Sequence, residues 1–482
     1  MLRLVQKAHN KFVPTDFSNS RFNRLILLIA TTVTFLLALS FLVVQREHVR
    51  HRFHISRPAE DHGPKQWCPP ESFSNETMVP IVEDISHQIN TSSKLPPSVL
   101  PPRKGDKQRL LEARKFVKAI LDPDNKEFRR YDCLSLTPTT KSRYAYLRKP
   151  SATSGAIRPK YFFALDLYQI ADVLPQLLGS LIEAIKFLGP HNCVLSIVEG
   201  RSTDGTYEIL RELGKEFEAL GLRYFLQTSD LHPQMNGDRI VLLSELRNLA
   251  LRDIYEQPQS YAPDTTIIFS NDIWLCTEDV LELVHQHFTQ ESYMTCAMDW
   301  NLNPGGHPRY YDAWVGRSMT GNSYYKNFFE QEKGMFWDDR PTNKRFESWQ
   351  PVQVFACWNG ITALTAQPFM NGTIRFRGVE YDKEECFQGE PGLLAKDLWF
   401  NGYGRIAVVP TINTAYYYDH MEIVRREKGS VSEHLCHSDV EKIVWKTEPP
   451  KKVKCKPSWE HKDTWVPWDQ GLRVCDPEST KC

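Results

Sequence analysis

The stretch "CVLSIVEGRSTDGTYEILRELGKEFEALG", Cys193 to Gly221, reads as a buried strand, a short polar turn and an amphipathic helix in direct succession. The apolar run that ends at Glu199 and Gly200 predicts the strand. The helix is predicted by apolar residues at helical spacing, namely Ile209, Leu210, Leu213, Phe217 and Leu220. A strand that leads straight into a helix is the repeating unit of α/β proteins.

The same alternation continues on both sides of this stretch. Strand-like runs occupy 160–169, 223–227 and 265–270, and helical patterns occupy 173–189 and 239–255. This alternation predicts βαβ crossovers, and therefore an α/β fold with a mainly parallel sheet and flanking helices. Ligands of such sheets bind beyond the carboxyl ends of the strands, so functional side chains are expected there.

The composition is that of a globular protein without a charge imbalance. The chain has 482 residues, of which 41% are hydrophobic and 12% aromatic, and its 59 basic and 59 acidic side chains cancel. Because zero net charge provides no general attraction to phosphate backbones, no nucleic-acid partner is expected. The length suits one large domain with accessory segments.

An apolar run near the start predicts a membrane anchor. Leu25 to Val44, "LILLIATTVTFLLALSFLVV", contains no charge. At about 1.5 Å per residue a helix of this length spans about 30 Å, which is the thickness of the hydrocarbon core. The run exceeds a signal-peptide core of roughly 7 to 15 residues. We predict a single-pass type II protein with a cytosolic tail at 1–24, an anchor at 25–44 and a luminal body.

Sequons and cysteines agree with a luminal body. Sequons begin at Asn75, Asn90 and Asn371, all beyond the anchor, so these asparagines are candidate glycosylation sites. Eleven cysteines leave at least one unpaired, and several are expected to form disulfides in an oxidising compartment. The spacing of these cysteines does not reveal how they pair. Because the chain has no CxxC motif, a structural zinc site of the usual kind is not expected.

The remaining segments flank a domain predicted at 160–440. Residues 45–159 are rich in Pro, Ser, Lys and Arg and read as a stem, partly ordered by a helix at 107–121. The tail at 441–482 is basic and then aromatic, with three cysteines. Many aromatic residues lie in irregular sequence between 299 and 420, which suits sugar stacking but is more often the packing of long loops.

The turn after the second strand carries two acidic candidates. Asp204 is placed to cap the following helix, and Gly205 keeps the start of that helix open. Glu199, at the strand end, could accept hydrogen bonds from a ribose or a base, although a capped turn without a ligand fits equally well. The chain lacks GxGxxG and GxxxxGK[ST] motifs, which argues against dinucleotide and P-loop chemistry.

A polar break interrupts "TTIIFSNDIWLC", Thr265 to Cys276, at Asn271 and Asp272. With the turn "VEGRSTDGT", this break resembles the donor site of GT-A glycosyltransferases, which bind a sugar nucleotide on the first half of the sheet. The resemblance implies that Asp272 holds a divalent metal, Mn²⁺ or Mg²⁺, on the donor diphosphate, with Asn271 in place of a second acid. Hard cations prefer such oxygen ligands. The alternative is a carboxylate that caps a bend.

Four further blocks narrow the resemblance to one family. They are "CAMDW" at 296–300, "YYDAWVGR" at 310–317, "VFACWNGI" at 354–361 and "ECFQGEPGLLAKDLW" at 385–399. Together they resemble the fungal capsule-associated α-1,3-mannosyltransferases of cryptococcal polysaccharide synthesis, over about 160–425. The resemblance implies a type II Golgi membrane glycoprotein that uses GDP-mannose and a divalent metal and retains the anomeric configuration.

The resemblance also assigns roles to single residues. Arg247 is expected to contact the donor, unless it is a solvated helical arginine. Glu390 could polarise the acceptor hydroxyl, a role for which Asp397 competes. His420 is a candidate second metal ligand or a structural histidine. The candidate acceptor-binding residues are Asp299, Asp312, Trp358 and Asn359, of which the two aspartates could instead cap loops.

The sequence therefore predicts metal-dependent, retaining transfer of mannose from GDP-mannose to the 3-hydroxyl of an α-mannose-containing glycan. One alternative is transfer of another sugar, or to another linkage, on the same fold. The other is a membrane-anchored glycan assembly protein without catalysis, an alternative that the missing first acid of the metal motif leaves open. The acceptor, the disulfide pairing and the oligomeric state are not fixed by the sequence.

Overall fold

The computed structural model describes residues 103–151, 158–234, 238–326, 334–438, 441–457 and 463–472. The predicted cytosolic tail, the anchor at 25–44 and the sequons at Asn75 and Asn90 lie outside these residues. Among the residues that are described, no helix has the length and apolar character to cross a bilayer. The boundaries predicted for the stem, the domain and the tail stay predictions.

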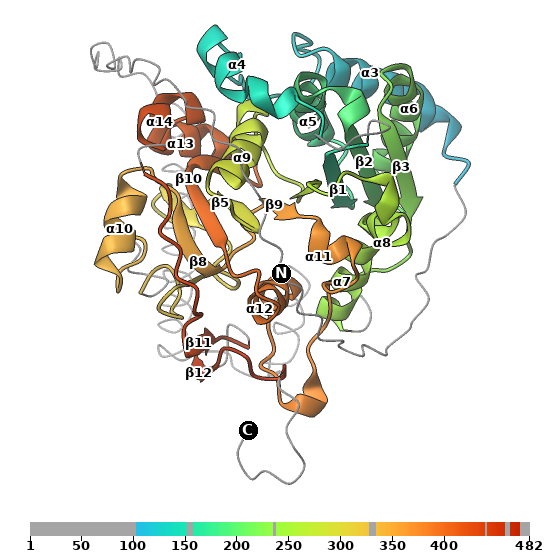
Figure 1. Cartoon of the computed structure of the whole chain (residues 1–482). Helices are drawn as coiled ribbons and strands as arrows, with labels where there is room; N and C mark the ends of the chain where they lie inside the picture. Colours follow the sequence, from blue (N-terminus) through green and yellow to red (C-terminus); the bar gives the residue numbers. More distant parts are fainter. Residues whose placement is uncertain are drawn as a thin grey trace, which may run out of the picture. The chain divides into compact units, whose positions relative to one another are not determined.

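The described residues are built on a ten-stranded sheet with the order β3-β2-β1-β4-β9-β5-β10-β8-β7, and β6 pairs with β5 (Figure 1). The strands are β1 Tyr161–Leu167, β2 Cys193–Glu199, β3 Arg223–Thr228, β4 Thr266–Ser270, β5 Met294–Leu302, β6 Pro308–Tyr310, β7 Arg317–Ser318, β8 Val352–Ala356, β9 Ile361–Thr365 and β10 Ile406–Ala415. The first four strands pair in parallel, as the sequence predicts. Only β6, β8 and β9 run against the direction shared by the others, so the sheet is mainly parallel in strand direction.

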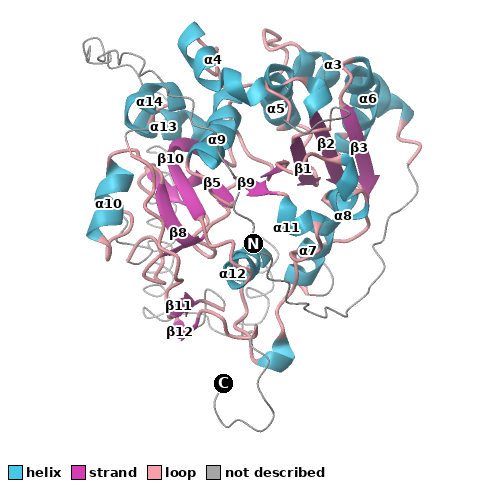
Figure 2. Ribbon diagram, in the orientation of Figure 1, coloured by secondary structure: helices cyan, strands magenta, loops and turns pink. Residues whose placement is uncertain are grey.

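Helices cover both faces of the sheet, which gives three layers (Figure 2). One face carries α3 Lys107–Leu121, α5 Leu174–Leu188, α6 Thr206–Ala219 and α9 Thr277–Thr289, and the other carries α7 Arg239–Ala250, α8 Arg252–Glu256, α11 Gln367–Met370 and α12 Glu390–Phe400. Alternate side chains of β1 point into the two cores, with Phe162 in one and Phe163 in the other. Full burial of such a ring contributes about 1.5–3 kcal/mol, so burial on both faces fixes the strand's register.

The remaining helices and strands surround this framework. They are α4 Pro138–Tyr144, α10 Arg340–Glu347, α13 Tyr418–Lys428, α14 Val431–Ser438, and the hairpin of β11 Lys452–Cys455 and β12 Thr464–Pro467. The single helix predicted over 239–255 is divided into α7 and α8, because the chain turns at Leu251.

The helix predicted at 107–121 is confirmed as α3, and it packs on α5 and α6. Asp106 caps it by accepting a hydrogen bond from Arg109 N. Just before the cap, Arg103 Nη1 donates to Ser202 O at 3.2 Å, and Arg103 O accepts from Tyr207 Oη at 2.6 Å. Residues 103–121 are therefore attached to the turn after β2.

Three disulfides confirm that several cysteines pair. They join Cys133 to Cys276, Cys296 to Cys357 and Cys386 to Cys455. The last links β11 to the loop that precedes α12, and nearby Lys396 Nζ donates to Gln470 O. Cys193, at the start of β2, is buried and has no disulfide partner. The described part of the predicted tail is thus held against α12.

Candidate functional site

Most of the candidate residues gather at the carboxyl edge of the sheet. Asp166 is the next-to-last residue of β1, Asn271 and Asp272 follow β4, and Tyr416 follows β10. Strand β9 runs antiparallel, so the residues that precede it reach the same edge. We call the edge cluster the following set: Asp166, Arg247, Asn271, Asp272, Asp299, Asp312, Trp358, Asn359, Glu390 and Tyr416.

A buried ion pair forms the centre of the edge cluster. Arg247 of α7 donates from Nε to Oε1 of Glu390, the first residue of α12, at 2.8 Å, and its Nη1 lies 4.0 Å from Asp166 Oδ1. The guanidinium also lies over the ring of Trp358, 4.3 Å from the ring centroid. Arg247 Nη1 is buried and has no hydrogen-bond partner within the described residues. An unpaired buried donor of this kind is suited to an anionic ligand.

Negative charge exceeds positive charge around this pair. Burial raises the pKa of Asp166 to about 6; Arg247 opposes this shift, while Glu390 and Asp272 add to it. Asp272 has an exposed side chain, but the protein around it still raises its pKa by desolvation. Three carboxylates around one guanidinium leave a negative site, which a bound cation would stabilise.

Loss of Arg247 should therefore destabilise the fold. Arg247→Met would leave Glu390 and Asp166 buried without their positive partner, and breaking a buried pair in this way costs about 3–5 kcal/mol. Urea denaturation would measure the loss. Arg375→Met is the matched control, because Arg375 is exposed and lies over the Tyr255 ring at 4.2 Å. Equal, small effects of the two substitutions would contradict the ion-pair assignment.

Asn271 is held by hydrogen bonds on both sides of its amide. Its Oδ1 accepts from Trp358 Nε1 at 3.0 Å, and its Nδ2 donates to Tyr416 Oη at 3.0 Å. The Tyr416 hydroxyl in turn donates to Asp299 Oδ2 at 3.4 Å. An aspartate at position 271 could not donate to Tyr416, which gives a physical reason for the amide in place of a second acid. Asn271 therefore fits a positioning role, and its donor-binding role stays a prediction.

Asp299 and Asp312 form a pair of neighbouring carboxyl groups, of which Asp299 is fully buried and Asp312 partly buried. Asp299 Oδ1 accepts from Asp312 N at 3.3 Å, and Asp312 Oδ2 accepts from Asn359 N at 3.0 Å. Burial and the neighbouring Asp312 raise the pKa of Asp299 well above its usual range, and burial raises the pKa of Asp312 to about 6. Asn359, which has a φ of 56°, is fully buried and donates from Nδ2 to Ala297 O at 2.7 Å.

The carboxyl pair predicts a pH dependence of stability. Both folded-state pKa values lie above the unfolded value of about 3.9, so the folded state binds protons more tightly. The free energy of unfolding should therefore fall as pH rises from about 4 through about 6 and stay lower above it. Asp299→Asn removes one acid, so the variant should gain stability relative to the native chain across this window. Urea midpoints at several pH values would check this; parallel curves would contradict it.

His420 has the lowered pKa expected of a metal ligand, but it does not belong to a group of metal-ligating side chains among the described residues. Burial lowers its pKa, which keeps the imidazole neutral near pH 7, and its Nδ1 has no hydrogen-bond partner among the described residues. Within those residues, no three His, Cys, Asp or Glu side chains are grouped as a metal site. Asp272 and His420 could supply two ligands at most, so the remaining ligands would have to be phosphate oxygens and water.

The two acidic residues at the end of β2 and in the turn after it make internal contacts. Glu199, the last residue of β2, is fully buried, and its Oε1 accepts from Ser202 N at 2.5 Å. Its Oε2 lies 3.8 Å from Arg103 Nη1 but has no hydrogen-bond partner among the described residues. The predicted N-cap at Asp204 is wrong by one residue, because Gly205, with a φ of 107°, caps α6. Asp204 instead accepts from Thr206 N at 3.0 Å across the turn. Their donor-binding roles stay predictions.

Asp397 lies in a different charge network. It pairs with Arg377 through two hydrogen bonds of 2.8 Å, and the same guanidinium contacts Glu385. The charged groups that act on Asp397 are Arg377, Glu385 and Lys396, and none of these three belongs to the edge cluster.

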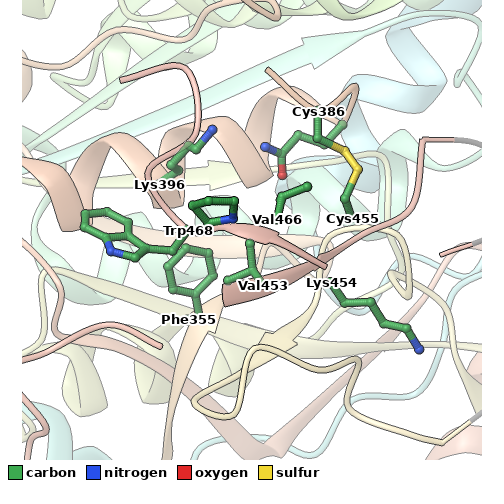
Figure 3. A pocket seen from close by; sticks show the side chains of 10 residues that line it. Phe355, Cys386, Lys396, Val453, Lys454, Cys455, Val466 and Trp468 are labelled. Atoms are coloured by element: carbon green, nitrogen blue, oxygen red, sulfur yellow. A yellow bond between two sulfur atoms is a disulfide. The ribbon is translucent and has the colours of Figure 1, made fainter. Parts of the chain in front are cut away.

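A small pocket lies nearby, beside the Cys386–Cys455 disulfide. It is lined by residues that include Phe355, Lys396 and Trp468, and none of the predicted site residues lines it (Figure 3).

Sequence reasoning missed Asp166 and Tyr416. Asp166 had a signal, since it is the only charged residue of the apolar run Tyr161–Leu167. Tyr416 had no such signal, because it is one of three consecutive tyrosines.

The same edge contains two exposed non-glycine residues in left-handed conformation, Gln169 with a φ of 55° and Arg201 with a φ of 59°. Such conformations cost about 1–3 kcal/mol each and concentrate at functional sites.

Comparisons with known proteins identify the family. The family model described as Cryptococcal mannosyltransferase 1 matches residues 160–397. The α-1,3-mannosyltransferase CMT1 of Cryptococcus neoformans var. neoformans serotype D is 32% identical over 358 residues, which is 70% of this chain and 72% of that protein. The chain is thus a glycosyltransferase by homology. It belongs to the cryptococcal mannosyltransferase family, as its sequence blocks predict.

Solved glycosyltransferase structures are more distant. The mannosyltransferase PcManGT from Pyrobaculum calidifontis, in complex with GDP-Man and Mn²⁺, is 11% identical with a TM-score of 0.31, covering 64% of this chain and 67% of its own. S. aureus TarS 1-349 in complex with UDP is 14% identical with a TM-score of 0.32, covering 59% and 67%. At these scores nothing about the chemistry of this chain follows from them.

Proposed function

We propose that this protein transfers mannose from GDP-mannose to the 3-hydroxyl of an α-mannose-containing glycan, with a divalent metal and with retention. The observation that supports this most is the edge cluster, in which the unpaired Nη1 of a buried arginine lies among three carboxylates, in a chain of this family. We further propose a type II protein of the Golgi membrane with a luminal catalytic domain.

Each member of the edge cluster has a distinct part in this reaction. Arg247 binds the diphosphate through its unpaired Nη1 and stabilises the charge that develops as the sugar–phosphate bond breaks. Glu390, fixed by Arg247, accepts a hydrogen bond from the acceptor hydroxyl and orients it. Asn271 fixes the chain at the end of β4, so that Asp272 faces the ligand.

Asp272 and His420 are the residues that would hold Mn²⁺ or Mg²⁺. Asp272 is an exposed carboxylate, and His420 is neutral with an unpaired nitrogen, so both suit a cation completed by phosphate and water. A bound divalent cation would supply positive charge to the departing diphosphate. The single carboxylate agrees with a site that forms fully only with the donor.

A donor scan tests the proposal against the other activities of the same fold. The full chain would be incubated with GDP-mannose, UDP-xylose or UDP-glucose, with an α-mannoside acceptor and with Mn²⁺ or EDTA. We expect transfer from GDP-mannose with Mn²⁺ only. Transfer from another donor would indicate a glycosyltransferase with a different donor specificity. No release of nucleotide from any donor would favour the non-catalytic assembly protein.

A further inference from the structure

The residues predicted to bind the acceptor lie mostly beneath the surface. Asp299 and Asn359 are fully buried, and Trp358 is 2% exposed. Their polar atoms bond to other protein groups, as described above, so they form the wall of the site rather than its contact surface. A saccharide acceptor needs exposed groups at the same edge of the sheet to hold its sugar ring, because Glu390 is itself only 2% exposed.

Two exposed tyrosines lie at this edge. Tyr311 is 47% exposed and Tyr417 is 59% exposed. Tyr311 follows β6, which pairs with β5, and Tyr417 follows β10, the neighbour of β5 in the sheet. An exposed aromatic ring beside a cluster of carboxylates is a suitable surface for a sugar, because pyranose C–H groups pack on ring faces while hydroxyls reach the acids.

The Tyr311 ring is held in place from behind. Its backbone N donates to Asp299 O at 3.0 Å, and its ring packs on the Tyr416 ring, with centroids 4.6 Å apart. Tyr416 is itself fixed through its hydroxyl by Asn271 and Asp299. Tyr311 is therefore an ordered ring with part of its surface in solvent, and it requires little further ordering when a ligand binds.

Tyr311 lies near enough to Tyr417 and Asp272 for their charges to influence it. Besides burial, the charges of Asp299, Tyr417, Asp312 and Asp272 contribute to the raised pKa of Tyr311. Tyr417 is the N-cap residue of α13, and its ring meets the His420 ring with centroids 4.9 Å apart. Each exposed ring thus lies near one of the residues proposed to hold the metal, Tyr417 beside His420 and Tyr311 near Asp272.

We propose that Tyr311 and Tyr417 form the platform on which a mannopyranose ring of the glycan acceptor lies. This inference rests on the proposed function and adds the residues that determine acceptor affinity. The nucleotide base of the donor could also stack on these two rings. The position of the platform favours the sugar, because β5 and β10 are separated in the sheet from the β1 and β2 ends, where the nucleotide is predicted, by β4 and β9.

Equilibrium titration of the full chain with α-mannobiose, in the presence of GDP and Mn²⁺, tests the platform independently of turnover. Tyr311→Ala and Tyr417→Ala should each weaken mannoside binding about twofold to tenfold, the effect of losing one aromatic contact, and leave GDP binding unchanged. Tyr311→Phe keeps the ring and should bind as the native chain does. Tyr146→Ala, at an exposed tyrosine bonded to His285, is the matched control.

Steady-state kinetics separate failure of this inference from failure of the proposed function. If the native chain transfers mannose, Tyr311→Ala should raise the acceptor KM with little change in kcat or in the donor KM. Unchanged mannoside binding in both alanine variants would overturn the platform, whether or not the chain transfers mannose. Weakened GDP binding with normal mannoside binding would also overturn it, because the rings would then hold the base. Absence of transfer by the native chain would refute the proposed function alone.

Discussion

Asp272→Asn should reduce metal-dependent transfer by about a hundredfold or more, with little change in stability. The substitution preserves the size of an exposed side chain but removes the only carboxylate predicted to bind the metal. It also removes negative charge from a site that holds three carboxylates and one guanidinium. We therefore expect weaker Mn²⁺ activation as well as a lower rate, which a titration of transfer against Mn²⁺ would measure.

The same strand provides a matched control for Asp272. Asp264 is also an exposed aspartate, but it precedes β4 and pairs with Lys160 at 3.1 Å, at the opposite edge of the sheet. Asp264→Asn should leave both the rate and the Mn²⁺ dependence unchanged. If Asp272→Asn transfers mannose as well as Asp264→Asn does, the metal assignment is wrong.

Glu390→Gln should lower kcat by about 10²–10⁴-fold, the range for loss of a positioned acid–base group. The glutamine oxygen can still accept from Arg247 Nε, so the fold and donor binding should persist. Pre-steady-state measurement would show normal GDP-mannose binding followed by slow transfer. This pattern would separate a role at the reaction centre from a role in binding alone.

Asp397→Asn distinguishes the two carboxylates of α12. Asp397 accepts two hydrogen bonds from Arg377, so its loss should lower stability by roughly 1–3 kcal/mol through a weakened buried pair. The kcat of the folded variant should stay near the native value. A large loss of kcat in Asp397→Asn, with normal kcat in Glu390→Gln, would exchange the roles assigned to them.

The first half of the fold followed from the sequence, and the second half did not. Strands β1, β2 and β4 are buried on both faces, and the helices that follow them carry apolar residues at helical spacing, so their sequence patterns are strong. Strands β7 to β9 are short and form antiparallel pairs with their neighbours, and this pairing depends on contacts between distant segments. The Cys296–Cys357 disulfide connects two such segments, and spacing alone did not reveal it.

The site divided along similar lines. The motifs that contain Asp272 and Glu390 allowed both to be predicted as site residues, and the structure brings them to one edge of the sheet. The burial of Asp299 and Asn359 and the network that fixes Asn271 depend on tertiary packing. The polar break in "TTIIFSNDIWLC" now has separate explanations for its two residues. Asn271 is an amide because it must accept from Trp358 and donate to Tyr416. Asp272, which is exposed, remains the residue predicted to bind the metal.

The linkage of the product provides the sharpest test of the proposed activity. The full chain would be incubated with GDP-mannose, Mn²⁺ and a panel of α-mannosides, and the product would be analysed by NMR. We predict a mannosyl residue joined α-1,3 to the acceptor mannose. A folded chain that binds GDP-mannose but forms no mannosyl product, or forms only another linkage, would contradict the proposal.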